Sequence, residues 1–212
     1  TWSNEMIGAL ERDPSIFPPC FESSSVSART AEGIPVVGGG GDQAAGAVGT
    51  GAVRPGVISV SLGTSGVVFT AIDSPNYDPN GATHTFCHAN GKWHAMGVML
   101  SCGGALRWYR DTFLPGASYD TISERASKAP IGAGGVSFLP YLTGERCPHN
   151  DPMARAVFAG MTLGTGQDDI ARAVFEGIGY GLLDGMTLLR SLGAHADEIR
   201  VTSGGAKSRF WV

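Results

Sequence analysis

A single carboxylate follows the longest glycine run of the chain. Gly38–Gly41 lead directly into Asp42, and residues 43–48, which are mostly small and apolar, predict a helix after it. A carboxylate at the mouth of a helix can accept the proton of a hydroxyl group while the hydroxyl oxygen attacks phosphorus. The local pattern by itself favours a plain helix N-cap for Asp42. The residues that lie near Asp42 in the folded chain are needed to distinguish a helix cap from a general base.

Three glycine-containing turns follow predicted strands, at 38–41, 63–66 and 203–208, and the first and last of them lead toward a helix. Backbone N–H groups in such turns, together with a helix dipole, can hold phosphate oxygens. The single-loop nucleotide motifs are absent, because Ala206 intervenes before Lys207 in the nearest approach to a P-loop and no G-x-G-x-x-G occurs. Each turn alone is more often only a turn, but the set of three predicts a nucleotide site.

The elements that position these turns are short strands early in the chain and helices later. Asn90-Gly91 between two alternating segments predicts a tight hairpin, and the turn at 63–66 predicts another. The strand at 34–37 is expected to be buried. The expected strands span 34–37, 57–62, 67–71, 85–89, 92–96, 136–140 and 198–202, and the expected helices span 3–11, 43–48, 103–110, 118–129 and 167–192.

The longest predicted helix, 167–192, carries apolar residues at helical spacing along one face. Thr165 and Asp168 resemble a capping box at its start. Four glycines interrupt it, at positions 177, 179, 181 and 185. Each glycine weakens a helix by up to about 1 kcal/mol relative to alanine. We therefore expect another part of the chain to approach this helix backbone closely.

Composition narrows the class of protein. The 212 residues are 42% hydrophobic and 16% charged, which is typical of a soluble globular domain. The net charge of −4 argues against nucleic acid as a partner, and no apolar run is long enough to span a membrane. The first residues lack signal-peptide features, so a cytoplasmic location is expected.

Four scattered cysteines predict neither disulfides nor a metal site, and His84, Cys87 and His88 are interpreted as ordinary strand residues.

Four segments, taken in order, resemble the motif series of the FGGY carbohydrate kinases. The similarity runs from about Pro35 to the end of the chain, and within the family it is greatest to the kinases of D-xylulose. It implies an α/β fold of the actin-like ATPase, ribonuclease-H-like class, with a mixed sheet, early antiparallel hairpins and flanking helices. The segments span residues 38–46, 61–66, 139–148 and 204–208.

The resemblance also implies a domain division and roles for individual residues. Residues 1–33 would be an interdomain connecting segment, and residues 34–212 would be the carboxyl-terminal kinase domain, incomplete at its end. Asp42 matches the catalytic base of the family. Ala206 and Arg209 match more weakly. The residues that match nucleotide-binding positions are Gly63 and Thr64 at the phosphates, Gly103 and Arg107, and Gly204 and Gly205 at the adenosine.

The implied reaction is ATP-dependent and Mg²⁺-dependent phosphorylation of D-xylulose to D-xylulose 5-phosphate. Ribulose, glycerol or another polyol is an alternative substrate, and a non-enzymatic actin-like nucleotide-binding module is an alternative function. The family's amino-terminal sugar domain is absent here, so this chain alone is expected to be inactive. The resemblance leaves open whether the protein is a monomer or a homodimer.

Glu145 and Arg146 belong to a family motif, in which they would form either a buried ion pair or contacts with the substrate.

Overall fold

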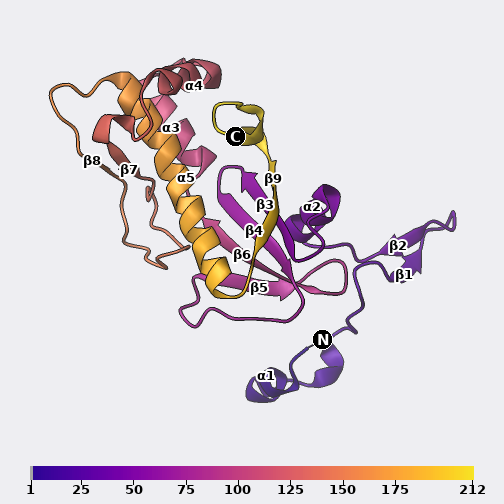
Figure 1. Cartoon of the computed structure of the whole chain (residues 1–212). Helices are drawn as coiled ribbons and strands as arrows, with labels where there is room; N and C mark the ends of the chain where they lie inside the picture. Colours follow the sequence, from indigo (N-terminus) through magenta and orange to yellow (C-terminus); the bar gives the residue numbers. More distant parts are fainter. Residues whose placement is uncertain (1) are drawn as a thin grey trace.

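The computed structural model describes residues 2–212 and is built around a five-stranded sheet (Figure 1). The strands lie in the order β5-β6-β4-β3-β9. Neighbouring strands from β5 to β3 in this order pair antiparallel. Strand β9 joins β3 in parallel, which makes the sheet mixed. Both predicted hairpins are therefore confirmed. The strands are β3 (Gly56–Leu62), β4 (Gly66–Ile72), β5 (Thr83–Cys87), β6 (Trp93–Met99) and β9 (Ala196–Thr202).

One helix covers each face of the central strands. Successive side chains of a strand point to opposite faces, so Val57 and Ile58 on β3 pack into different apolar clusters. The Val57 cluster includes Ala47 of α2 (Asp42–Thr50), and the Ile58 cluster includes Leu189 of α5 (Gln167–Ser191). Figure 1 shows the sheet between these two helices. Burial on both faces stabilises the strands by about 1.5–3 kcal/mol for each large apolar side chain.

The glycines of α5 confirm the expected close approach at some positions and not at others. A Cβ atom at Gly177 would collide with the backbone carbonyl of Phe138, and one at Gly181 would lie 3.1 Å from the Cε atom of Met99. Gly179, in contrast, has no atom within 4 Å of its Cβ position, so the expectation is wrong there. The helix thus needs glycine where a strand lies against it.

The beginning of α5 differs by one residue from the predicted capping box. The N-cap residue is Gly166, and its N–H donates a 2.9 Å hydrogen bond to Asp169. Asp168 instead pairs with Arg125 at 3.2 Å. Within residues 2–212, no helix combines the length and the apolarity needed to cross a membrane.

A second layer packs against the first half of α5. It contains α3 (Gly103–Phe113), α4 (Tyr119–Lys128) and a ribbon of β7 (Ser137–Leu139) with β8 (Val157–Ala159). The sequence predicted both helices and β7 but not β8, whose three residues are too short for a periodic pattern. Short 3-10 turns complete the elements: η1 (Pro14–Ile16), η2 (Ala133–Gly135) and η3 (Gly204–Lys207).

Residues 2–40 lie to one side of the main sheet (Figure 1). They form α1 (Asn4–Ala9) and a two-stranded ribbon of β1 (Val26–Arg29) and β2 (Pro35–Val37). The expectation that 34–37 would be buried is wrong, because β2 pairs only with β1 and all of its residues are exposed. The proposed domain boundary after residue 33 falls in the turn between these two strands.

Candidate functional site

A cavity of about 810 Å³ opens at the carboxyl ends of β3 and β9. Such an edge, where strands give way to loops, is a common place for ligand sites in α/β folds. All six residues that the sequence assigned to a nucleotide line this one cavity, although they come from three separate parts of the chain. They are Gly63 and Thr64, Gly103 and Arg107, and Gly204 and Gly205.

The tip of the β3–β4 hairpin is fixed to the first turn of α3. The carbonyl of Gly63 accepts a 2.8 Å hydrogen bond from the N–H of Gly103, and the carbonyl of Thr64 accepts 3.0 Å bonds from Cys102 and Gly104. A Cβ atom at Gly103 would lie 2.7 Å from the Gly63 carbonyl oxygen, so only glycine allows this contact. The hairpin tip is therefore held in one position at the cavity wall.

Unused donors and positive charges face the same cavity. Within the described residues, no hydrogen bond uses the backbone N–H groups of Thr64 and Gly205, which both line the cavity. Arg107 and Lys207 also line it, and neither forms an ion pair within residues 2–212. Free N–H groups beside unpaired cations are the arrangement that holds phosphate oxygens.

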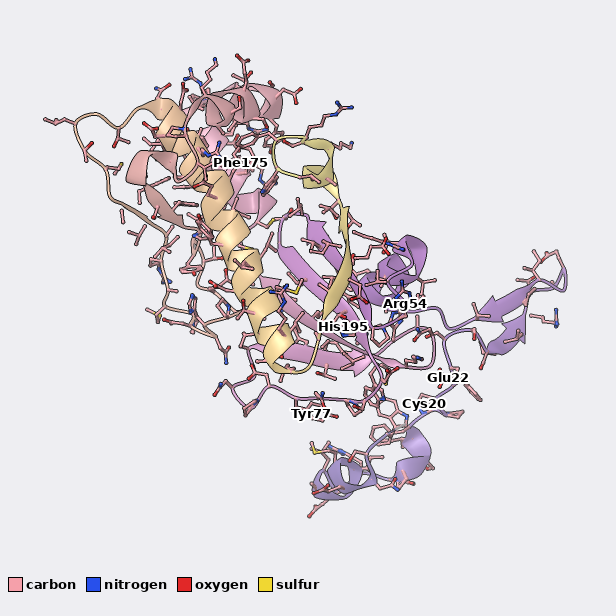
Figure 2. The ribbon with its side chains drawn as sticks, viewed as in Figure 1. Cys20, Glu22, Arg54, Tyr77, Phe175 and His195 are labelled. Carbon is pink, nitrogen blue, oxygen red and sulfur yellow. The ribbon has the colours of Figure 1, made fainter. Side chains whose placement is uncertain are left out.

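An apolar wall lies beside these polar groups. Phe175 of α5 contacts the rings of Phe210 and Trp211 edge-on, with centroids 5.1 and 5.2 Å apart. Figure 2 shows Phe175 on the part of α5 nearest the turn that follows β9. Phe175 and Trp211 line the cavity with Leu62 and Leu106. The cavity can thus accept a ligand with one anionic end and one apolar, planar end.

Sequence reasoning missed several residues that line the cavity. Leu106 and Arg110 follow Gly103 at helical spacing, so the period of α3 could have identified them. The contribution of α4 had no local signal, because it depends on how α4 packs against α5. Ala206 and Arg209, the weaker matches, do not line the cavity. The other missed residues are Ser118, Tyr119, Asp120, Ser123, Phe175, Lys207, Ser208 and Trp211.

Asp42 lies outside this cavity, in a smaller one of about 280 Å³. It is the first residue of α2, one position after the N-cap residue Gly41, so the predicted N-cap position is wrong by one. Its Oδ1 accepts a 2.8 Å hydrogen bond from the N–H of Gln43, and the carboxylate is exposed. Half of the other lining residues carry a hydroxyl group, namely Thr50, Ser59, Ser61, Thr202 and Ser203.

The two cavities lie on either side of the ends of β3 and β9. Ser61 lines the smaller cavity while Leu62, the next residue, lines the larger one. In the same way, Ser203 lines the smaller cavity and Gly204 the larger one. The Asp42 cavity and the cavity that suits phosphates are therefore both lined at the ends of the same two strands.

Glu145 and Arg146 do not form the ion pair that was considered for them. Glu145 is 2% exposed, and its Oε1 accepts hydrogen bonds from the N–H groups of Leu100 (2.8 Å) and Arg146 (2.7 Å). Burial raises the pKa of the Glu145 carboxyl above its ordinary value. The guanidinium of Arg146 lies 3.2 Å from the ring of His84. Glu145 thus fixes the 145–148 loop to the end of β6, just before α3 begins.

Comparison with protein families gives one match over most of the chain. Residues 58–212 match the carboxyl-terminal domain of the FGGY family of carbohydrate kinases. Two curated relatives, the xylulose kinases of Klebsiella pneumoniae and Escherichia coli K12, are 43% and 41% identical to this chain. Each comparison covers 99% of this chain and 45% of the relative. The chain therefore spans about half the length of the curated relatives it matches.

Solved structures show the same fold. A ligand-bound xylulose kinase from Lactobacillus acidophilus superposes with a TM-score of 0.91 at 27% identity, over 100% of this chain and 45% of that one. The glycerol kinase of Plasmodium falciparum, at 23% identity, superposes with a TM-score of 0.86 over 100% of this chain and 44% of that one. These neighbours belong to the actin-like, ribonuclease-H-like class, so the predicted α/β fold with a mixed sheet is confirmed.

Proposed function

Because this chain belongs to the FGGY family of carbohydrate kinases, we propose that it is the ATP-binding half of an enzyme that converts D-xylulose to D-xylulose 5-phosphate. The similarity to named xylulose kinases supports this choice of sugar. One structural observation carries the mechanism, namely that the Asp42 cavity and the cavity suited to phosphates lie at the ends of the same two strands. We also propose that the full-length enzyme has a second domain, which supplies contacts to the sugar.

The proposed reaction is direct transfer of the γ-phosphoryl group. The terminal hydroxyl oxygen of the sugar attacks the γ-phosphorus, and the bond between that phosphorus and the β,γ-bridging oxygen breaks. The electron pair of the broken bond leaves with ADP, and the hydroxyl proton passes to the carboxylate of Asp42. Asp42 suits this role because it is exposed to its cavity and its carboxylate has no cationic partner within the described residues.

In this proposal, ATP binds in the larger cavity. Backbone N–H groups at Thr64 and Gly205 and the cations Arg107 and Lys207 would hold phosphate oxygens, and the wall formed by Phe175 and Trp211 would adjoin the nucleoside. Mg²⁺ would arrive with ATP as part of the substrate. Within residues 2–212, no three His, Cys, Asp or Glu side chains are grouped to hold a metal, which fits an ion bound through phosphate oxygens and water.

The test is Asp42→Asn in the full-length enzyme, which removes the proton acceptor and keeps the shape of the side chain. We expect turnover with D-xylulose to fall by about 10²–10⁴, while the Kd of ATP stays within about twofold. Asp168→Asn is the matched control, because it makes the same change in the first turn of α5, away from both cavities. Near-normal turnover of Asp42→Asn would exclude Asp42 as the base.

A further inference from the structure

Ser203 has a backbone conformation that is almost confined to glycine. Its φ is 69° and its ψ is −169°. A residue with a Cβ atom is strained in this region, at a cost of about 1–3 kcal/mol, and such strain is concentrated at functional sites. The neighbours Gly204 and Gly205 lie in the same turn without a side chain. A serine kept at a position where glycine would be relaxed suggests that its hydroxyl has a use.

The Ser203 hydroxyl is paired with the hydroxyl of Ser61. The two Oγ atoms are 2.8 Å apart and join the ends of β9 and β3, 142 residues apart in sequence. Each hydroxyl has one proton to donate and two lone pairs to accept. One proton is used between the two oxygens, so the pair keeps one proton for a ligand. Both hydroxyls lie 3.9 Å from the Cβ position of Gly63, beside the hairpin tip.

This hydroxyl pair lies at the strand ends that separate the two cavities. Ser61 and Ser203 line the smaller cavity with Asp42, and the residues that follow each serine line the larger one. If ATP occupies the larger cavity and the attacking hydroxyl lies at Asp42, the transferred phosphoryl group must pass this boundary. Its equatorial oxygens carry the charge that develops during transfer, and donors fixed at that point stabilise it.

We propose that Ser203, held by Ser61, is a further catalytic residue that donates a hydrogen bond to the transferred phosphoryl group. The inference rests on the proposed kinase function. Ser203 is exposed, so its proton can reach a ligand without rearrangement of the chain. The hydrogen bond to Ser61 keeps the Ser203 hydroxyl in place. The backbone strain at Ser203 predicts that stability rises and activity falls when the side chain is removed.

The experiment compares Ser203→Gly, Ser203→Ala and Ser61→Ala in the full-length enzyme, with kcat, the KM of ATP and the Tm as readouts. Ser203→Gly relieves the strain, so we expect a higher Tm together with a kcat lower by about 10-fold or more. Ser203→Ala keeps the strain and should lower kcat without raising the Tm. Ser61→Ala should lower kcat less. In all three, the KM of ATP should change by less than about twofold.

The control is Ser137→Ala, an exposed serine of β7 that lines none of the cavities described. It should leave kcat and Tm unchanged. A kcat within twofold of the parent for both Ser203 variants would overturn the inference, whatever happens to the Tm. That result leaves the proposed function intact if Asp42→Asn still abolishes turnover. The function itself fails only if the parent enzyme shows no sugar-dependent release of ADP.

Discussion

The backbone N–H of Gly103 donates a 2.8 Å hydrogen bond to the carbonyl oxygen of Gly63. This bond joins the tip of the β3–β4 hairpin to the first turn of α3, and both residues line the larger cavity. Since the amide of Gly103 is already used, the first turn of α3 contributes to the site by fixing the hairpin tip. The tip then presents the free N–H of Thr64 in one orientation.

Gly103→Ala should therefore weaken ATP binding. The new Cβ would lie 2.7 Å from the Gly63 oxygen, a backbone atom, so the hairpin tip or α3 must shift. We expect the Kd of ATP, measured by titration calorimetry, to rise by about 10-fold or more, since at least one charge-assisted hydrogen bond is misplaced. Gly8→Ala is the control, because nothing lies within 4 Å of its Cβ position. Equal Kd values for the two variants would contradict the account of the hairpin tip.

Arg107→Ala should weaken ATP binding through loss of a cation. Arg107 lines the larger cavity and has no acidic partner within the described residues, so it is free to contact a phosphate. A hydrogen bond to a charged group contributes about 1.5–3 kcal/mol, which predicts a Kd higher by about 10- to 100-fold. The same titration on Arg190→Ala, an exposed arginine in the last turn of α5, should give the parental value. A parental Kd for Arg107→Ala would remove this residue from the site.

Two glycines of α5 should respond to alanine with opposite signs. Gly177→Ala places a Cβ against the Phe138 carbonyl, and overpacking of this kind costs about 1–3 kcal/mol or more. Gly179→Ala meets no atom within 4 Å and should stabilise the helix by up to about 1 kcal/mol. Urea unfolding with unchanged m-values measures both free energies. Stabilisation of similar size at both positions would show that helix propensity, not the approach of β7, sets the effect.

Acid should destabilise the fold through His94. Burial lowers the pKa of His94 to about 4, with the neighbouring His88 as a second cause. Its unfolded pKa is about 6.5, so the unfolded chain binds the proton first as the pH falls. The free energy of unfolding should therefore decrease between about pH 6.5 and pH 4, by roughly 3 kcal/mol, and this contribution should level off below pH 4.

His94→Phe provides the comparison for that pH dependence. The ring of His94 stacks on Phe69 with centroids 4.5 Å apart, and its buried Nδ1 has no hydrogen-bond partner within the described residues. A phenylalanine should therefore be tolerated and should reduce the loss of stability between pH 6.5 and pH 4. A His94→Phe curve parallel to that of the parent would exclude His94 as the cause.

The sequence predicted what short-range patterns can encode. Asn90-Gly91 marked a hairpin because that turn needs residues that tolerate positive φ, and the glycines of α5 indicated close packing. Burial of 34–37 was predicted wrongly, because apolar residues indicate a strand but not whether a second layer covers it. The position of Ser203 beside Ser61 could not be predicted, since it depends on the parallel pairing of β9 with β3. The residues of α4 that line the cavity could not be predicted either, because their position depends on how the helices pack.

The most direct test of the central claim is ADP release by the full-length enzyme supplied with ATP and Mg²⁺. The assay compares D-xylulose, D-ribulose, glycerol and no sugar. We predict clear stimulation by D-xylulose, weak or no stimulation by D-ribulose and glycerol, and a low rate without sugar. Stimulation by D-ribulose or glycerol in place of D-xylulose would contradict the assigned substrate, and no stimulation by any of the three would contradict the sugar kinase assignment itself.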